Sequence, residues 1–166
     1  MLVKLADSIG QKHVRSKRLQ WGKLDWRKRT CTRIKNISHT VPLLISSTSW
    51  TEDEDFNLLL LALQQFESSP LTLPKVIMVV TGKGPLRSQF ENQIRIHDWK
   101  RVEFRFEWLS REEYPLLVGC ADLGVCLHTS SSGLDLPMKV VDMFGCGVPV
   151  CAVGYPWYAL YSNLEM

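Results

Sequence analysis

The chain has 166 residues, of which 45% are hydrophobic and 22% charged, the composition of an ordinary globular protein with its own core. No apolar run reaches the roughly 20 residues of a membrane-spanning helix. The apolar start at residues 1–6 is interrupted by Lys4 and is too short for the core of a signal peptide. We therefore expect no membrane-spanning segment within this sequence.

The net charge of +3 conceals two segments of opposite charge. Residues 1–40 carry 11 lysines and arginines against 2 aspartates, whereas residues 41–166 carry 9 basic against 15 acidic residues. Because such a cationic segment buries little apolar surface, we expect residues 1–40 to form a basic, poorly ordered extension. The alternative is a contact with acidic lipid or nucleic acid, and Trp21 and Trp26 favour the membrane surface. We expect no nucleic-acid partner.

Five cysteines stand at positions 31, 120, 126, 146 and 151, and none forms a Cys-x-x-Cys pair. Their number is odd and four lie in apolar contexts, so we expect buried free thiols in a reducing compartment. No histidine or second cysteine stands at the spacing of a metal ligand, so the sequence predicts no metal site.

From residue 41 the chain alternates between apolar runs and amphipathic segments. Residues 43–48 are typical of a buried strand. Thr51 and Glu54 then have the Thr-x-x-Glu spacing of a capping box, which predicts the start of a helix. The apolar face of that helix follows at helical spacing, and it consists of Phe56, Leu59, Leu60, Leu63 and Phe66.

The middle of the chain repeats this pattern. A buried strand is predicted at residues 76–80, and a helix through Leu86, Phe90 and Ile94 follows a glycine-rich turn. Residues 101–106 alternate in polarity and predict a strand with one wetter face. Ser110 and Glu113 form a second capping-box pattern, which opens a helix with Tyr114, Leu117 and Val118 on its apolar face.

Two further strands are predicted at residues 123–127 and 148–153. Between them Pro137 is favourable at a helix start, and we expect that helix to turn Val140, Val141 and Phe144 inward. Strands separated by helices of this length indicate right-handed βαβ units and a parallel sheet. The sequence therefore predicts an α/β fold class, with a Rossmann-like domain over residues 41–153.

Residues 154–166 have a different character, because they leave no room for a helix that would cover the last strand. We expect them to form a divergent tail and the domain to be truncated at its C-terminus. An uncovered last strand would expose an apolar face, and such patches attract a partner or promote aggregation.

Ligands of open parallel sheets bind at the carboxyl ends of the strands, so the loops there are the candidate site. Ser47 lies in a hydroxyl-rich loop that leads into a helix N-terminus, where it either contacts an anion or only forms the turn. Gly82 and Gly84 let the backbone approach a ligand, and Lys83 between them supplies a positive charge. Trp108 either stacks on a base or ribose or caps the core.

The loop and helix start at residues 128–142 hold the most candidate contacts. A diphosphate there would meet backbone amides and the positive end of the helix that begins at Pro137, with Lys139 in its first turn. The carboxylate of Asp142 has the place to accept hydrogen bonds from a ribose diol, and His128 is a candidate contact to phosphate or sugar. The candidate loop residues are Ser131, Ser132, Gly133, Leu134 and Asp135. The alternative for the whole loop is a solvated helix entry.

Three blocks, at residues 46–56, 81–86 and 121–146, resemble the chitobiosyldiphosphodolichol β-mannosyltransferases. These endoplasmic-reticulum enzymes add the first mannose to the dolichol-linked N-glycan precursor. The resemblance covers residues 41–153, and more broadly it is to the C-terminal, donor-binding domain of GT-B glycosyltransferases. In that superfamily two acids eight apart bracket the donor site. The second acid falls on Asp142, and the first falls on Leu134, with Asp135 one place away.

The resemblance implies GDP-mannose as donor substrate, inversion at the anomeric carbon, no obligatory metal and no cofactor. It implies a dolichol-linked acceptor, bound through an N-terminal domain that residues 1–40 do not resemble, and other dolichol-pathway mannosyltransferases as partners. We therefore expect a mannosyltransferase by resemblance, with this chain alone lacking the acceptor half needed for activity. The implied location is the cytosolic face of the endoplasmic reticulum membrane. No residue stands out as the catalytic base. The alternative is a truncated, inactive paralogue that at most binds GDP or a protein partner.

Overall fold

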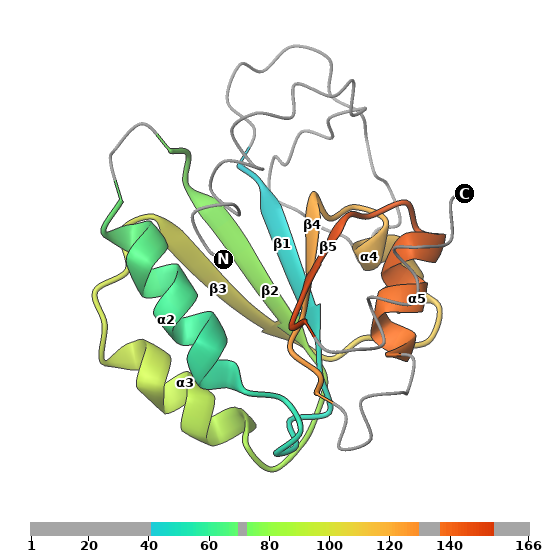
Figure 1. Ribbon diagram of the computed structural model, residues 1–166, viewed down its shortest axis with the longest axis horizontal. Coiled ribbons are helices and arrows are strands. Elements are labelled where there is room, and N and C mark those ends of the chain that lie inside the picture. The colour runs from blue at the N-terminus through green and yellow to red at the C-terminus, as the bar shows by residue number, and fades with distance from the viewer. Residues whose placement is uncertain (1–40, 70–72, 130–136, 155–166) are drawn as a thin grey trace.

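The computed structural model describes residues 41–69, 73–129 and 137–154, which form one parallel sheet with helices on both faces (Figure 1). The five strands are ordered β3-β2-β1-β4-β5 across the sheet. This confirms the predicted α/β class. The predicted basic extension and nearly all of the predicted tail lie outside the described residues. The strands are β1 (Leu43–Ser47), β2 (Val76–Thr81), β3 (Val102–Glu107), β4 (Leu123–Cys126) and β5 (Val150–Ala152).

The helices divide into two layers. In Figure 1, α2 and α3 lie against one side of the sheet, and α4 and α5 lie at the opposite side. Each layer has its own apolar core, one with α2 and α3 and the other with α4 and α5. The helices are α2 (Phe56–Glu67), α3 (Arg87–Arg95), α4 (Glu113–Val118) and α5 (Met138–Gly145). None of the described helices is long and apolar enough to cross a membrane.

The order of the strands creates a topological switch point between β1 and β4. From β1 the chain moves outward to β2 and β3, and it then returns through α4 to pair β4 with the free side of β1. The loops that leave β1 and β4 therefore diverge toward opposite layers. In open α/β sheets the crevice at such a point is the usual ligand site.

The apolar face of α5 differs from the prediction. Val140 and Met143 are buried, whereas Val141 is 38% exposed and Phe144 is 63% exposed, so the predicted inward face was wrong for two of its three residues. The reason is a close approach to β4. A Cβ on Gly124 would lie 2.4 Å from the sulfur of Met143, so the missing side chain of Gly124 admits this methionine against the sheet. Val141 and Phe144, each one position further along the helix, point away.

The two predicted capping boxes have different outcomes. The second is confirmed, because the Ser110 amide donates to Glu113 Oε2 at 2.9 Å and the Glu113 amide donates to Ser110 Oγ at 3.2 Å. The first was wrong. Helix α2 begins at Phe56 and its N-cap is Asp55, whose side chain accepts the Asn57 amide at 3.0 Å. Glu54 turns its side chain elsewhere.

No disulfide is found among the described cysteines, Cys120, Cys126, Cys146 and Cys151, and Cys31 lies outside the described residues. Burial holds only for Cys126, because Cys120, Cys146 and Cys151 are half-buried. The expectation of buried thiols was therefore wrong for these three. The partial burial of Cys151 still raises the pKa of its thiol, because the thiolate would lose hydration.

Candidate functional site

The loop after β1 is held in a strained and buried conformation. Trp50 has a positive φ of 55°, uncommon for a residue with a side chain, and it is fully buried. Its ring stacks on Phe56 with the ring centroids 4.5 Å apart, and its amide donates to Thr48 Oγ1 at 2.7 Å. Aromatic packing and hydrogen bonding together fix this backbone. The loop is therefore shaped before any ligand arrives.

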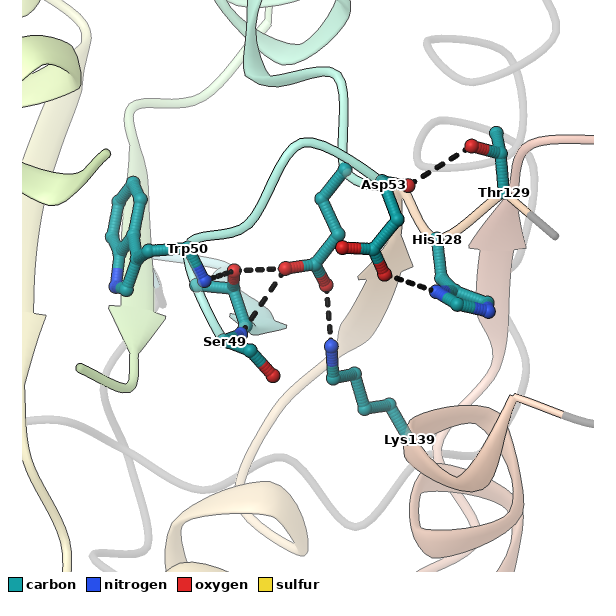
Figure 2. A network of polar contacts seen from close by, with 8 residues as sticks. Ser49, Trp50, Asp53, His128, Thr129 and Lys139 are labelled. Carbon is teal, nitrogen blue, oxygen red and sulfur yellow. Dashed lines mark hydrogen bonds and ion pairs between the residues drawn. The ribbon is translucent and has the colours of Figure 1, made fainter. Parts of the chain in front are cut away.

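Glu54 joins this loop to α5 through a polar network, in which Figure 2 labels Ser49, Trp50 and Lys139. One carboxylate oxygen accepts the Thr48 hydroxyl and, at 3.1 Å, the Ser49 amide. The other oxygen accepts Lys139 Nζ at 2.5 Å. The Glu54 side chain is only 2% exposed and the Lys139 side chain 23%, so this ion pair is largely removed from water. A buried carboxylate needs such partners to offset its lost hydration.

The preceding residue, Asp53, holds the end of β4 (Figure 2). Its carboxylate lies 2.8 Å from His128 Nδ1, and its carbonyl accepts both the amide and the hydroxyl of Thr129, each at 2.9 Å. The pKa of Asp53 is lowered, chiefly by a hydrogen bond from Thr51 and further by His128, against a smaller opposing effect of burial. The turn at residues 53 and 54 therefore ties the β1 loop to both β4 and α5.

The glycine pair after β2 lies directly against the β1 loop. Gly82 has φ +127°, and a Cβ there would lie 1.8 Å from the Thr48 carbonyl oxygen. A Cβ on Gly84 would lie 1.9 Å from the Ser49 carbonyl oxygen. These glycines therefore serve the packing of two loops. Whether they also approach a ligand stays a prediction.

Lys83, between the glycines, lies over the ring of Trp108, with Nζ 4.3 Å from the ring centroid. Trp108 is 57% exposed, so it does not cap the core as one alternative held. The pair places a cation and an aromatic face side by side at the carboxyl ends of β2 and β3. Such a surface suits an anionic ligand with a planar group.

Ser47, Tyr114 and Asp142 bring three polar groups to the other side of β1. The Ser47 hydroxyl is buried and makes no hydrogen bond of ordinary geometry with the described residues. Burial raises the pKa of Tyr114; the Ser47 hydroxyl opposes this shift and the Asp142 carboxylate adds to it. The Tyr114 hydroxyl therefore stays protonated and available as a hydrogen-bond donor near Asp142.

The structure brings several predicted site residues together. His128 and Lys139 both reach the turn at residues 53 and 54, and Ser47 and Asp142 both lie near Tyr114. Lys83 and its flanking glycines pack beside the β1 loop. Five predicted residues lie outside the described part of the chain: Ser131, Ser132, Gly133, Leu134 and Asp135.

Three residues of the site were missed by sequence reasoning. Asp53 and Glu54 lie in an acidic run that was interpreted as helix capping, and Tyr114 was interpreted as part of an apolar helix face. The one available signal was the unusual density of four acids directly after a strand end. It indicates that at least one acid has a tertiary partner.

Comparison with known proteins finds curated homologues of this chain. No family model matches it. A chitobiosyldiphosphodolichol β-mannosyltransferase of Mus musculus is 62% identical over 125 residues, which are 74% of this chain and 26% of the relative. One from Homo sapiens is 60% identical over 116 residues, 68% of this chain and 25% of the relative. The chain is a homologue of the chitobiosyldiphosphodolichol β-mannosyltransferases. It spans about a quarter of the length of these β-mannosyltransferase relatives.

Homologues are also found outside animals, and the fold is shared with a protein of much lower sequence identity. The UDP-glycosyltransferase TURAN of Arabidopsis thaliana is 50% identical over 129 residues, 68% of this chain and 28% of the relative. Among solved structures, the pneumococcal O-GlcNAc transferase GtfA in complex with UDP and GlcNAc matches 69% of this chain and 21% of its own, with a TM-score of 0.53 at 16% identity. GtfA is a GT-B glycosyltransferase, so the β-mannosyltransferase homologue shares its fold with that class.

Proposed function

We propose that the carboxyl edge of the sheet at β1 and β4 binds GDP-mannose. The observation that carries this proposal is the coincidence of three facts at one place. The switch point lies between β1 and β4, polar side chains from β1, β4 and α5 gather there, and the chain is homologous to enzymes named as mannosyltransferases. A nucleoside diphosphate is the ligand type that such crevices bind in α/β folds.

The donor diphosphate is assigned to the start of α5 and the loop before it. Helix α5 has no side-chain cap at its N-terminus, so its first amide groups are free to meet an anion. The loop contacts are Ser131, Ser132, Gly133, Leu134 and Asp135, with His128 at the start of the loop. Lys139 lies in the first turn of α5 and is already paired with Glu54. During transfer the diphosphate leaves and its negative charge grows. The free amide groups at the start of α5 would stabilise that charge.

The nucleoside is assigned to the surrounding groups. Asp142 is exposed on α5 and has the place to accept hydrogen bonds from the ribose diol. Ser47 offers a buried hydroxyl next to Tyr114. Gly82, Lys83 and Gly84 border the same edge from β2, where Lys83 supplies positive charge.

The reaction proposed for the whole protein is transfer of mannose from GDP-mannose to dolichol-diphosphate-linked chitobiose. It forms a β-1,4 linkage with inversion, in N-glycan precursor assembly at the cytosolic face of the endoplasmic reticulum membrane. The homologues' names, which specify a chitobiosyldiphosphodolichol acceptor and a β-mannosyl product, support this assignment. The acceptor and other dolichol-pathway mannosyltransferases are its proposed partners.

A transfer assay tests the reaction. The chain is incubated with GDP-mannose and the dolichol-linked chitobiose acceptor, and UDP-GlcNAc serves as the control donor. A glycosylated acceptor that forms with GDP-mannose and not with UDP-GlcNAc supports the proposed enzyme. Calorimetric binding of GDP-mannose without any transfer would instead favour the second candidate, a catalytically inactive paralogue that binds GDP. No binding of GDP-mannose at millimolar concentration would contradict both.

A further inference from the structure

Lys139 has two alternative uses within the site. It lies in the first turn of α5, where a cation is well placed to meet the diphosphate of a nucleotide. In the structure, however, its Nζ binds Glu54 Oε1 at 2.5 Å, and its side chain is three-quarters buried. The charge of Lys139 would act on the nucleotide if Lys139 bound the phosphate, and on Glu54 if Lys139 were its structural partner.

The surroundings of Glu54 favour the structural use. Its carboxylate is almost fully buried, and one of its oxygens is already occupied by the Thr48 hydroxyl and the Ser49 amide. The only cation paired with Glu54 among the described residues is Lys139. If Lys139 turned to a phosphate, a buried carboxylate would lose its counter-charge beside an incoming anion. Removing one partner of a buried ion pair is costly because the other charge stays unsolvated.

The same turn also fixes the other side of the switch point. Asp53 holds His128 at 2.8 Å and Thr129 through two hydrogen bonds of 2.9 Å (Figure 2). Two consecutive acids therefore fasten the β1 loop, the end of β4 and the start of α5 together. The ion pair between Glu54 and Lys139 is the link that reaches α5.

We propose that Lys139 is a positioning residue that locks the start of α5 onto Glu54 and does not itself bind the donor diphosphate. The charge of Lys139 is paired with that of Glu54. Lys139 therefore affects the ligand only by positioning the first turn of α5. This inference rests on the proposed function for its binding test. It also predicts an energetic coupling between the two residues that exists without any ligand.

The test is a double-mutant cycle of Lys139→Gln, Glu54→Gln and the combined variant in the full chain, with GDP as the calorimetric probe. Lys139→Gln leaves the buried Glu54 without its counter-charge, so GDP affinity falls about tenfold and the melting temperature drops by several degrees. Two glutamines restore a neutral, hydrogen-bonded pair. The combined variant therefore regains GDP affinity to within about threefold of wild type and recovers most of the melting temperature.

The direct-ligand alternative gives the opposite pattern. The combined variant would recover stability but keep the full loss of GDP affinity, and this result would overturn the proposal. Glu54→Gln alone would free Lys139 and tighten GDP binding if the lysine were a ligand, whereas the proposal predicts equal or weaker binding.

The matched control is the exposed pair of Lys100 and Asp98, 3.7 Å apart with side chains 77% and 86% exposed. Lys100→Gln, Asp98→Asn and their combination should leave both melting temperature and GDP affinity unchanged. If the wild type binds no GDP, the proposed function fails. The melting temperatures still show whether Glu54 and Lys139 are energetically coupled. Additive melting-temperature changes at Glu54 and Lys139 would then overturn the positioning role.

Discussion

Two segments of this chain have the same Ser/Thr-x-x-Glu spacing, and their glutamates do different things. Ser110 and Glu113 exchange hydrogen bonds at the start of α4, as the pattern predicts. Glu54, three residues after Thr51, instead binds Thr48, Ser49 and Lys139. The difference lies in what surrounds them. Glu113 lies at the exposed start of α4, whereas Glu54 lies at the switch point, where the β1 loop and α5 present polar groups to it.

The comparison shows that a local motif holds only where no tertiary partner competes. A capping box satisfies two amide groups that water would otherwise solvate, and its net gain is small. A buried carboxylate that lost its hydroxyl, amide and ammonium partners would cost several kcal/mol, which exceeds the gain of a capping box, so the tertiary arrangement takes precedence. Asp55 then takes over as the N-cap of α2.

The largest expected effect comes from displacing the loop that Glu54 holds. Gly82→Ala places a Cβ 1.8 Å from the Thr48 carbonyl oxygen at a φ of +127°. We expect a loss of at least about 3 kcal/mol in the free energy of unfolding, measured by urea denaturation. Gly147→Ala is the control, because Gly147 has φ +71° but a Cβ there would meet nothing within 4 Å, and it should cost only about 1 kcal/mol. Equal losses would show that the clash with Thr48 does not matter.

The comparison itself is tested by replacing each glutamate with alanine. Glu54→Ala leaves a buried hydroxyl and a largely buried lysine without their partner, and we expect a loss of about 3 kcal/mol. Glu113→Ala removes an exposed capping contact and should cost about 0.5 kcal/mol. The free energies of unfolding of both variants are compared at neutral pH. A similar loss at the two positions would contradict the distinction between them.

The smallest expected effect concerns Asp53. Its pKa is lowered in the folded state, so its carboxylate stabilises the fold at neutral pH, and this stabilisation is lost as the pH falls below 3.8 toward the lowered value. The Asp53 side chain is 42% exposed, so screening by solvent limits the cost of Asp53→Asn to about 0.5 kcal/mol at neutral pH. Denaturation curves of variant and wild type should therefore converge as the pH falls below 3.8. A difference that grew on acidification would have the wrong sign.

The sequence predicted the fold better than the site. All five strands and the alternating helices follow from apolar runs and helical spacing, because burial in a parallel sheet leaves a strong local signal. The inward face of α5 was missed because it depends on Gly124, a residue of another element that admits Met143. The pairing of Glu54 with Lys139 spans 85 positions, and no local pattern specifies it.

The candidate site shows the same limit. Gly82, Lys83 and Gly84 were singled out for a ligand, yet the packing of Gly82 and Gly84 against the β1 loop is visible only in three dimensions. Tyr114 was assigned to an apolar helix face, because its spacing does not reveal that its hydroxyl reaches Ser47 and Asp142. Geometry leaves the identities of the sugar and the nucleotide open, and the names of the homologues support mannose as the sugar in the proposed function.

The central claim is that this edge of the sheet is a donor site for GDP-mannose, and calorimetry of the full chain with GDP tests it most directly. Wild type and Lys100→Gln should bind GDP equally. Asp142→Ala should weaken binding at least about tenfold, and this loss should shrink with 2′,3′-dideoxy-GDP, which has no ribose diol for the carboxylate to bind. Equal GDP affinity in wild type and Asp142→Ala, or no binding by wild type at millimolar GDP, would contradict the claim.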